Sequence, residues 1–133
     1  MNPDLTMSLR ILLAAALGGA IGYQRERAGK AAGLRTNMLI CVGSALFTVV
    51  SIYGFTGPAD PSRVAAGIVA GVGFIGAGSI ILRREEGYIA GLTTAATIWA
   101  AAGVGVAAGA GLYIAAIVTT AVILGVLFLP HLK

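Results

Sequence analysis

Five apolar segments fill almost the whole of this 133-residue chain, and the charged residues lie nearly all in the gaps between them. Only 11% of the residues are charged, 58% are hydrophobic, and the mean hydropathy is +0.94. A soluble domain of this size is mostly surface and needs more charge to stay in solution. The sequence therefore predicts one membrane domain whose apolar segments lie in a lipid bilayer.

Each apolar segment is long enough to cross the bilayer as a helix, which takes about 20 residues. Lipid offers no hydrogen-bond partners, so the backbone must pair with itself inside each span, as a helix does. A closed barrel would need alternating polarity, which these segments lack. We expect an all-α bundle that forms a single domain over residues 1–133. Its five spans are predicted at about residues 5–23, 34–53, 64–82, 89–108 and 112–129.

The basic residues predict the orientation of these spans, because cytoplasmic loops carry an excess of Lys and Arg. Seven basic residues flank one side: Arg25, Arg27, Lys30, Arg35, Arg83, Arg84 and Lys133. Only Arg10 and Arg63 flank the other side. We expect the N-terminus outside and the C-terminus in the cytoplasm. The net charge of +4 is then explained by loop charge, and no nucleic-acid partner is expected.

The short turn at Gly109-Ala110-Gly111 leaves an alternative topology open. If the last two segments formed one long helix, the chain would cross the bilayer four times. Both termini would then lie on the same side.

Twenty glycines indicate close helix packing, since small residues let membrane helices approach each other. The predicted packing positions are Gly18, Gly22, Gly67, Gly71, Gly73, Gly76, Gly78, Gly105, Gly109 and Trp99. These faces exceed what five helices need, so we also expect self-association, most simply a homodimer. The alternative reading of GVGFIGAG is a broken helix that offers backbone groups to an ion.

Polar residues from distant parts of the sequence are predicted to meet on the cytoplasmic side. They are Arg25, Glu26, Arg35, Thr36, Asn37, Thr93, Thr94 and Thr97. The functional reading is a small polar site for a partner or an ion, with ion pairs among Arg25, Glu26 and Arg35. Separately, each has a structural explanation: arginines anchor at the interface, and Thr93 or Thr94 caps a helix. At the outer side, Asp60 or Ser62 is expected to cap the third span.

Several chemistries find no support in the sequence. Cys41 is the only cysteine and His131 lies at the extreme end. No span carries an acidic residue at its centre, and no carboxylate cluster suits magnesium or calcium. No nucleophile–base pair or nucleotide-binding motif is present. We expect no enzymatic activity, no metal centre and no cofactor.

Three blocks of sequence carry a family resemblance. They are IGYQRE with AGLRTN at 21–37, RVAAGIVAGVGFIGAG at 63–78, and GLTTAATIWAAAGVG at 91–105. In order and spacing, the chain resembles the MgtC/SapB family of bacterial membrane proteins from about Leu9 to Leu129. The resemblance implies a five-span inner-membrane domain. It also implies that Arg25, Glu26, Arg35, Thr94 and Trp99 matter to fold or activity.

The resemblance further implies a non-enzymatic regulator linked to survival at low magnesium and to persistence inside host phagocytes. The best-studied members are thought to restrain the F-type ATP synthase and to alter phosphate uptake. The chain departs from the family at Gln24, where many members have Glu, and at Gly67, where many have Gln. Those members also continue into a C-terminal cytoplasmic domain, so the resemblance here is to the transmembrane domain alone.

A small ion channel or transporter is the competing hypothesis. Fluoride channels are equally short and glycine-rich, with an arginine near the first span. They normally carry a Thr-Thr-Phe-Ser element, of which GLTTAAT offers only the threonines.

Overall fold

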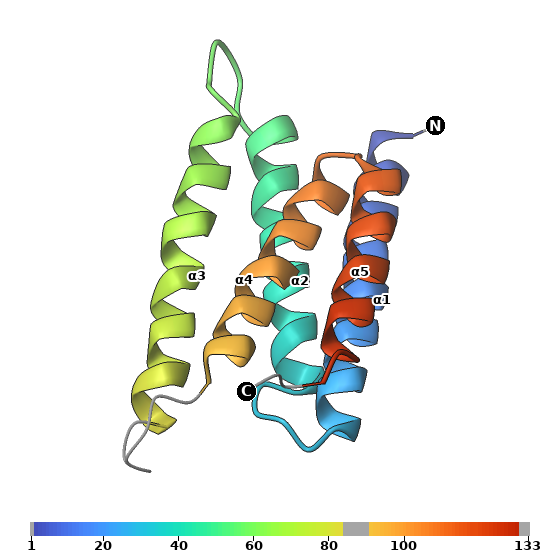
Figure 1. Cartoon of the computed structure of the whole chain (residues 1–133). Coiled ribbons are helices and arrows are strands. Elements are labelled where there is room, and N and C mark those ends of the chain that lie inside the picture. The colour runs from blue at the N-terminus through green and yellow to red at the C-terminus, as the bar shows by residue number, and fades with distance from the viewer. Residues whose placement is uncertain (1, 84–90, 131–133) are drawn as a thin grey trace.

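The computed structural model describes residues 2–83 and 91–130, excepting the side chains of residues 81–83. This part of the chain forms helices and no strand. The helices are α1 (Pro3–Arg27), α2 (Leu34–Tyr53), α3 (Ser62–Arg83), α4 (Leu92–Gly109) and α5 (Tyr113–Leu127). They run alternately down and up, so that α1 begins and α5 ends at opposite ends of the bundle (Figure 1). The predicted all-α fold is confirmed.

Four helices, α1 to α4, are long and apolar enough to cross a membrane. Helix α5 is equally apolar but has only 15 residues. The structure thus shows four membrane-length helices, and a fifth crossing stays a prediction. The expected start of the fourth span at residue 89 lies outside the described residues.

Helices α4 and α5 are separate, so the alternative of one long helix is wrong. Helix α4 ends at Gly109, and Gly111 takes a left-handed φ of 85° in the turn that follows. Helix α1 extends to Arg27, beyond the predicted end at residue 23. Its last turns are polar but contain good helix formers, so hydropathy underestimates its length.

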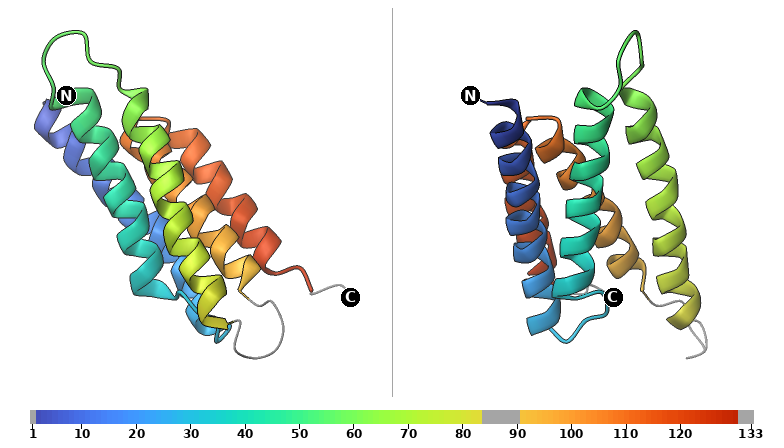
Figure 2. Two further views of the ribbon diagram at one scale, coloured as in Figure 1. Left: turned by 90° about the vertical axis from the view of Figure 1, so that its left-hand side faces the viewer. Right: turned by 180° about the vertical axis from the view of Figure 1, so that it is seen from behind.

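The bundle has a tight part and an open part. Helix α2 packs extensively against α1 and α4, whereas α3 packs mainly along α4 and touches α2 little. Helix α3 therefore lies at one side of the molecule (Figures 1 and 2). The main core consists largely of small side chains, including Ala14, Cys41, Ala45, Ala101 and Ala108.

Glycines make this tight packing possible. A Cβ at Gly18 would lie 2.6 Å from the Cys41 Cβ, and one at Gly22 would lie 2.6 Å from the Leu34 Cα. A Cβ at Gly109 would lie 2.6 Å from the carbonyl oxygen of Ala45, and a Cβ at Gly105 would collide with the carbonyl oxygen of Cys41. Helices α1 and α4 thus contact the backbone of α2 from two sides.

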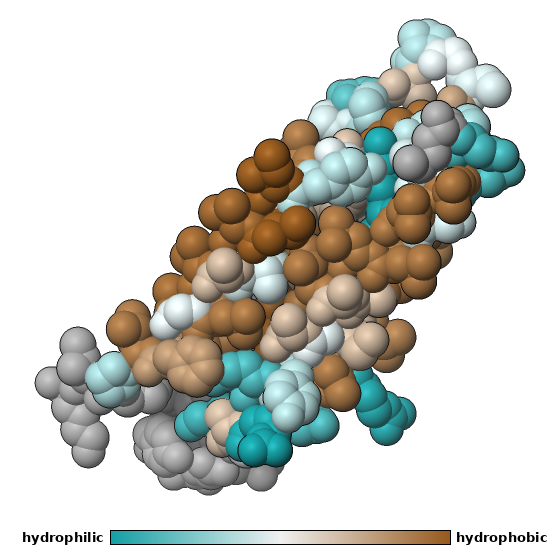
Figure 3. All heavy atoms as spheres, turned by 90° about the vertical axis from the view of Figure 1, so that its right-hand side faces the viewer, coloured by the Kyte–Doolittle hydropathy of each residue, from teal (hydrophilic) through white to brown (hydrophobic). Residues whose placement is uncertain are grey.

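The outer surface of the bundle is apolar around its middle. Large exposed side chains include Leu12, Leu39, Phe74, Ile114 and Val122. Figure 3 shows hydrophobic residues across the centre of one face and hydrophilic residues gathered at its ends. Such a band is incompatible with water but suits a bilayer core, so the chain is a membrane protein.

Candidate functional site

The last turns of α1, the first turn of α2 and the start of α4 meet at one end of the bundle. Arg25 is only 4% exposed and lies on the α1 face that also carries Gly18, Ile21 and Gly22. The close approach at Gly22 brings the start of α2 against this face. The Arg25 Nη2 donates a hydrogen bond to the Oγ1 of Thr94, which ties α1 to α4.

Asn37 is completely buried in the first turns of α2. Its Nδ2 donates to the carbonyl oxygens of Ala32 and Gly33, at 2.7 and 3.0 Å. These bonds hold the connection between α1 and α2 in place. Because two carbonyls face the same amide atom, that atom must be the nitrogen, and the orientation of the amide group is fixed.

The predicted ion-pair network of Arg25, Glu26 and Arg35 is wrong at Arg25, which bonds to Thr94 instead. Successive helical residues point about 100° apart, so Arg25 faces α4 while Glu26 faces outward. The Glu26 Oε1 lies 3.5 Å from the backbone nitrogen of Leu34, where its charge suits the start of α2. Glu26, Arg35 and Thr36 are exposed. They line a polar hollow of about 280 Å³ together with Gly33, Leu34 and Leu39.

The threonines of α4 do not cap it, contrary to expectation. The helix begins at Leu92 after Gly91, which provides no side-chain cap. Thr97 is buried and donates to the carbonyl of Thr93 at 2.7 Å, whereas Thr93 itself is exposed. Of the three threonines predicted in α4, Thr94 is the one that accepts a hydrogen bond from Arg25. At the other end, the Asp60 carboxylate accepts hydrogen bonds from the backbone and hydroxyl of Ser62, as expected.

Three buried side-chain atoms in the described part of the chain lack a hydrogen-bond partner: Gln24 Oε1, Arg25 Nε and Asn37 Oδ1. All three come from the α1–α2 end of the bundle. Sequence analysis predicted positions 25 and 37 here but treated Gln24 only as a departure from the family. We group Gln24, Arg25, Asn37 and Thr94 as the candidate site, called the polar junction below. The hydrogen bond from Arg25 to Thr94 joins two of these side chains, and the other two carry the unpaired acceptors.

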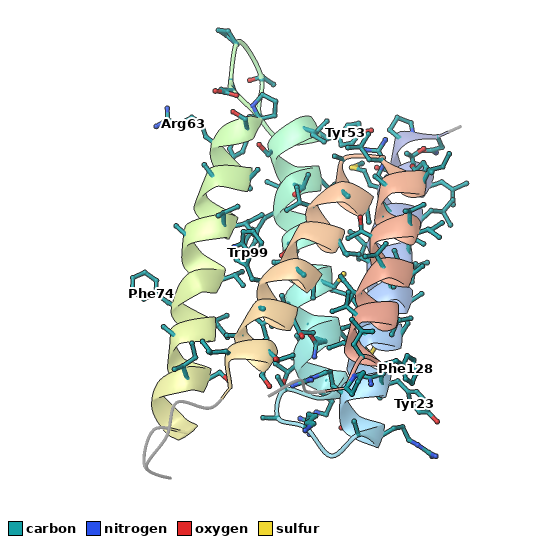
Figure 4. All side chains as sticks on the ribbon, in the orientation of Figure 1. Tyr23, Tyr53, Arg63, Phe74, Trp99 and Phe128 are labelled. Carbon is teal, nitrogen blue, oxygen red and sulfur yellow. The ribbon has the colours of Figure 1, made fainter. Side chains whose placement is uncertain are left out.

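Most glycines of α3 do not pack against another part of this chain. Gly67, Gly71, Gly73 and Gly78 have no atom within 4 Å of an added Cβ, and only Gly76 approaches α4, at Ala95. Trp99 was expected to pack inside the bundle. It is 56% exposed instead, so this expectation is wrong. Phe74 is 82% exposed and projects from the outer side of α3 (Figure 4).

An apolar groove runs between α2 and α3. Its volume is about 520 Å³, and its lining includes Leu39, Gly43, Phe47, Gly67 and Gly71. Small side chains on α3 leave the groove open along the side of the bundle. Gly67 and Gly71 lie in this groove and have open space beside them, so the chain itself does not cover this side of α3.

At the opposite end, Arg10 makes a set of contacts that the sequence did not predict. The Arg10 Nη1 donates to the carbonyl of Gly109 at 3.1 Å, and its Nε donates to the Tyr113 hydroxyl at 3.0 Å. The guanidinium also lies 5.4 Å from the ring centre of Tyr53. A Cβ at Gly111 would lie 2.7 Å from its Nη2, so the turn fits around this arginine. Tyr53 and Tyr113, which lie at the Arg10 end of two predicted spans, were the available signal.

The residues that the structure describes contain no cluster of three or more His, Cys, Asp or Glu that could hold a metal ion.

Comparisons with known proteins agree on one family. The model of the MgtC family matches residues 11–132. The chain is 53% identical over 112 residues to "Putative magnesium transporter YhiD" of Escherichia coli strain K12, covering 79% of this chain and 51% of the relative. It is 50% identical over 111 residues to "Protein MgtC" of Brucella abortus strain 2308, covering 83% of this chain and 45% of the relative.

A third relative is "Protein SapB" of Bacillus subtilis strain 168, which is 46% identical over 138 residues, covering 98% of this chain and 58% of the relative. The chain thus spans about half the length of the curated relatives it matches. No solved structure matches it.

Proposed function

We propose, given that the chain belongs to the MgtC family, that it is a non-enzymatic membrane regulator that acts by contacting other membrane proteins. The observation that carries the proposal is the uncovered glycine face of α3. Gly67, Gly71 and Gly78 share one face of α3 and have open space beside them, whereas Gly18, Gly22, Gly105 and Gly109 are tightly packed. Gly73 is also open but lies on another side of α3.

Open glycines in a membrane helix favour docking of another helix. Apolar burial contributes little inside lipid, so association depends on close backbone approach and van der Waals packing. An α3 glycine face beside an open groove offers both a flat surface and a recess. Helix α3 packs mainly along α4 and touches α2 little, so the rest of its surface is free for a partner.

Family resemblance supplies the biological setting of this proposal. It links the chain to adaptation to low magnesium, to restraint of the F-type ATP synthase and to phosphate uptake. We place it in the bacterial inner membrane, with the N-terminus outside and the basic end in the cytoplasm. The ATP synthase is the partner that the proposal names first.

Photo-crosslinking in native membranes tests the proposal. Phe74 on α3 is replaced by p-benzoylphenylalanine, and Phe128 beyond α5, which is 75% exposed, receives the same replacement as a control. We expect a protein adduct of defined mass from position 74 and none from position 128. Mass spectrometry then identifies the partner. Adducts with lipid alone at position 74 would contradict the proposal.

Ion transport is a second candidate function, and the polar junction favours it. Buried polar side chains in a membrane bundle commonly mark an ion or substrate path. Purified protein in sealed vesicles should then show ion-selective flux that disappears in Asn37→Leu and in Thr94→Val. Thr97→Val is the matched control, because the Thr97 hydroxyl only bonds to its own helix. Absence of flux would leave the regulator proposal standing.

A further inference from the structure

The polar junction holds an unusual set of unpaired groups. Arg25 Nε is a donor, whereas Asn37 Oδ1 and Gln24 Oε1 are acceptors. They are the only buried side-chain nitrogen or oxygen atoms without a partner within residues 2–80 and 91–130. Native proteins normally fill such positions with a bound water or ion, because an unpaired buried polar group is costly.

Arg25 makes the junction positively charged. Arg25 is only 4% exposed, and its side-chain hydrogen bond goes to the neutral hydroxyl of Thr94. The neighbouring Glu26 is turned toward the Leu34 nitrogen. A buried charge is tolerated only when an opposite charge or strong acceptors surround it. Within the described residues, no carboxylate bonds to this guanidinium, so the junction suits an anion.

Asn37 restricts which anion fits. Its Nδ2 is committed to the carbonyls of Ala32 and Gly33, so its Oδ1 is presented as a buried acceptor. An acceptor repels an anion that has no hydrogen to donate, such as chloride or sulfate at neutral pH. It favours an anion that keeps an O–H group. Gln24 Oε1 adds a second acceptor of the same kind.

We propose that the polar junction binds a small oxyanion that carries a hydroxyl group, of the hydrogen phosphate class. An anion oxygen accepts from the Arg25 Nε–H, and the anion hydroxyl donates to Asn37 Oδ1 or Gln24 Oε1. Thr94 holds the guanidinium in position. This inference does not depend on the regulator proposal, since the site forms within one chain. The phosphate is either a free ion or the headgroup of a phosphomonoester lipid.

Thermal unfolding of the purified chain in lipid-free detergent is the primary test. A ligand that binds only the folded state raises the Tm. At pH 7 and constant ionic strength, we expect inorganic phosphate to raise the Tm by several degrees, and sulfate and chloride to have no effect. Arg25→Met and Gln24→Leu should lower the affinity for phosphate at least tenfold. Gln24 is only partly buried, so its variant should fold even if Arg25→Met does not.

Two further arms identify the source of the phosphate. Vesicles of phosphatidylcholine, with or without phosphatidic acid, replace the detergent. A Tm rise with inorganic phosphate identifies a free ion. A rise with phosphatidic acid alone, abolished by Gln24→Leu, identifies a lipid headgroup. Thr97→Val, one turn along α4 from Thr94, is the matched control and should respond as the natural chain does.

Three results would overturn the proposal. Equal shifts with phosphate, sulfate and chloride would show non-specific salt stabilisation, and no shift with either phosphate source would indicate bound water only. The third result concerns Glu85 and Glu86, which lie outside the described residues. A phosphate response seen only in the double variant Glu85→Gln, Glu86→Gln would show that a carboxylate of the chain neutralises Arg25.

Discussion

Glycines of the same helix have different roles in this chain, depending on which atoms lie beside them. Gly105 presses against the carbonyl of Cys41, and a Cβ there would also lie 2.8 Å from the Ser44 Cβ. Gly103, two residues earlier in α4, has no atom within 4 Å. The contact partner, and not the residue type, therefore decides the effect of a substitution.

This contrast gives a matched prediction. Gly105→Ala should destabilise the bundle by about 1–3 kcal/mol, because backbone atoms cannot move aside for the added methyl. Gly103→Ala should stabilise it by about 0.5–1 kcal/mol, since alanine is the better helix former. Denaturant unfolding in detergent, followed by circular dichroism, measures both. Equal effects of the two substitutions would show that α2 and α4 are not in close contact.

Arg10 is a second residue whose role is local and testable. It bonds to Gly109 and Tyr113 and lies near the Tyr53 ring. These contacts join α1, α2, α4 and α5 at the end of the bundle opposite Arg25. Arg10→Gln should cost about 1–3 kcal/mol of unfolding free energy, since hydrogen bonds from a charged group are lost. Arg63→Gln, at the exposed start of α3, is the control and should change stability little. The same denaturant measurement applies.

At the scale of helices, the sequence predicts most of the fold because lipid permits little else. Long apolar runs must be helices, and the turn at 110–112 is marked by its glycines. Hydropathy fails where polar residues continue a helix, as at Gln24 to Arg27 in α1. It also gives no direction for a side chain, so the inward turn of Arg25 toward Thr94 required the packing of three helices. The same reason explains why the outward face of α3 was not foreseen.

The start of α3 carries a pH-dependent contact. Hydrogen bonds from the hydroxyl and backbone N–H of Ser62 hold the pKa of Asp60 below its usual value. A carboxyl with a lowered folded-state pKa stabilises the fold above its unfolded pKa of about 3.9. That contribution is lost as the pH falls through the folded-state pKa. The protection factors of the first-turn amides of α3, which are exchange rates corrected for the intrinsic rate at each pH, should therefore fall in acid, and this fall should be absent in Asp60→Asn.

At the scale of the whole molecule, the alternating helices give the bundle two distinct ends. Arg25 and Arg35 lie at one end, where α1 ends and α2 begins, whereas Arg10 and Arg63 lie at the other (Figure 4 labels Arg63). The separation of basic residues predicted from the sequence is thus matched by the fold, as far as the described residues extend. Which end faces the cytoplasm is a separate prediction.

Cysteine labelling in intact cells checks that orientation. In a Cys41→Ala background, Asn2→Cys should react with a membrane-impermeant maleimide, and Ala28→Cys should react only after the cells are opened. The reason is that α1 begins at one end of the bundle and reaches the opposite end at Arg27. Equal labelling of both positions in intact cells would contradict a single crossing by α1. Labelling of Ala28→Cys alone would reverse the orientation.

The last prediction concerns assembly, where the uncovered surface of α3 acts as a whole. If a second copy covers this surface, close backbone approach at Gly71 is essential, and a large side chain there prevents it. Gly71→Leu should convert a dimer to a monomer in detergent, as measured by light scattering. Gly125→Leu on α5 is the matched control, because this glycine is equally open but lies on another helix. A dimer that survives Gly71→Leu and dissociates in Gly125→Leu would place the interface on α5. The glycine face of α3 would then be free for a different membrane protein, and the crosslink from position 74 would decide that case.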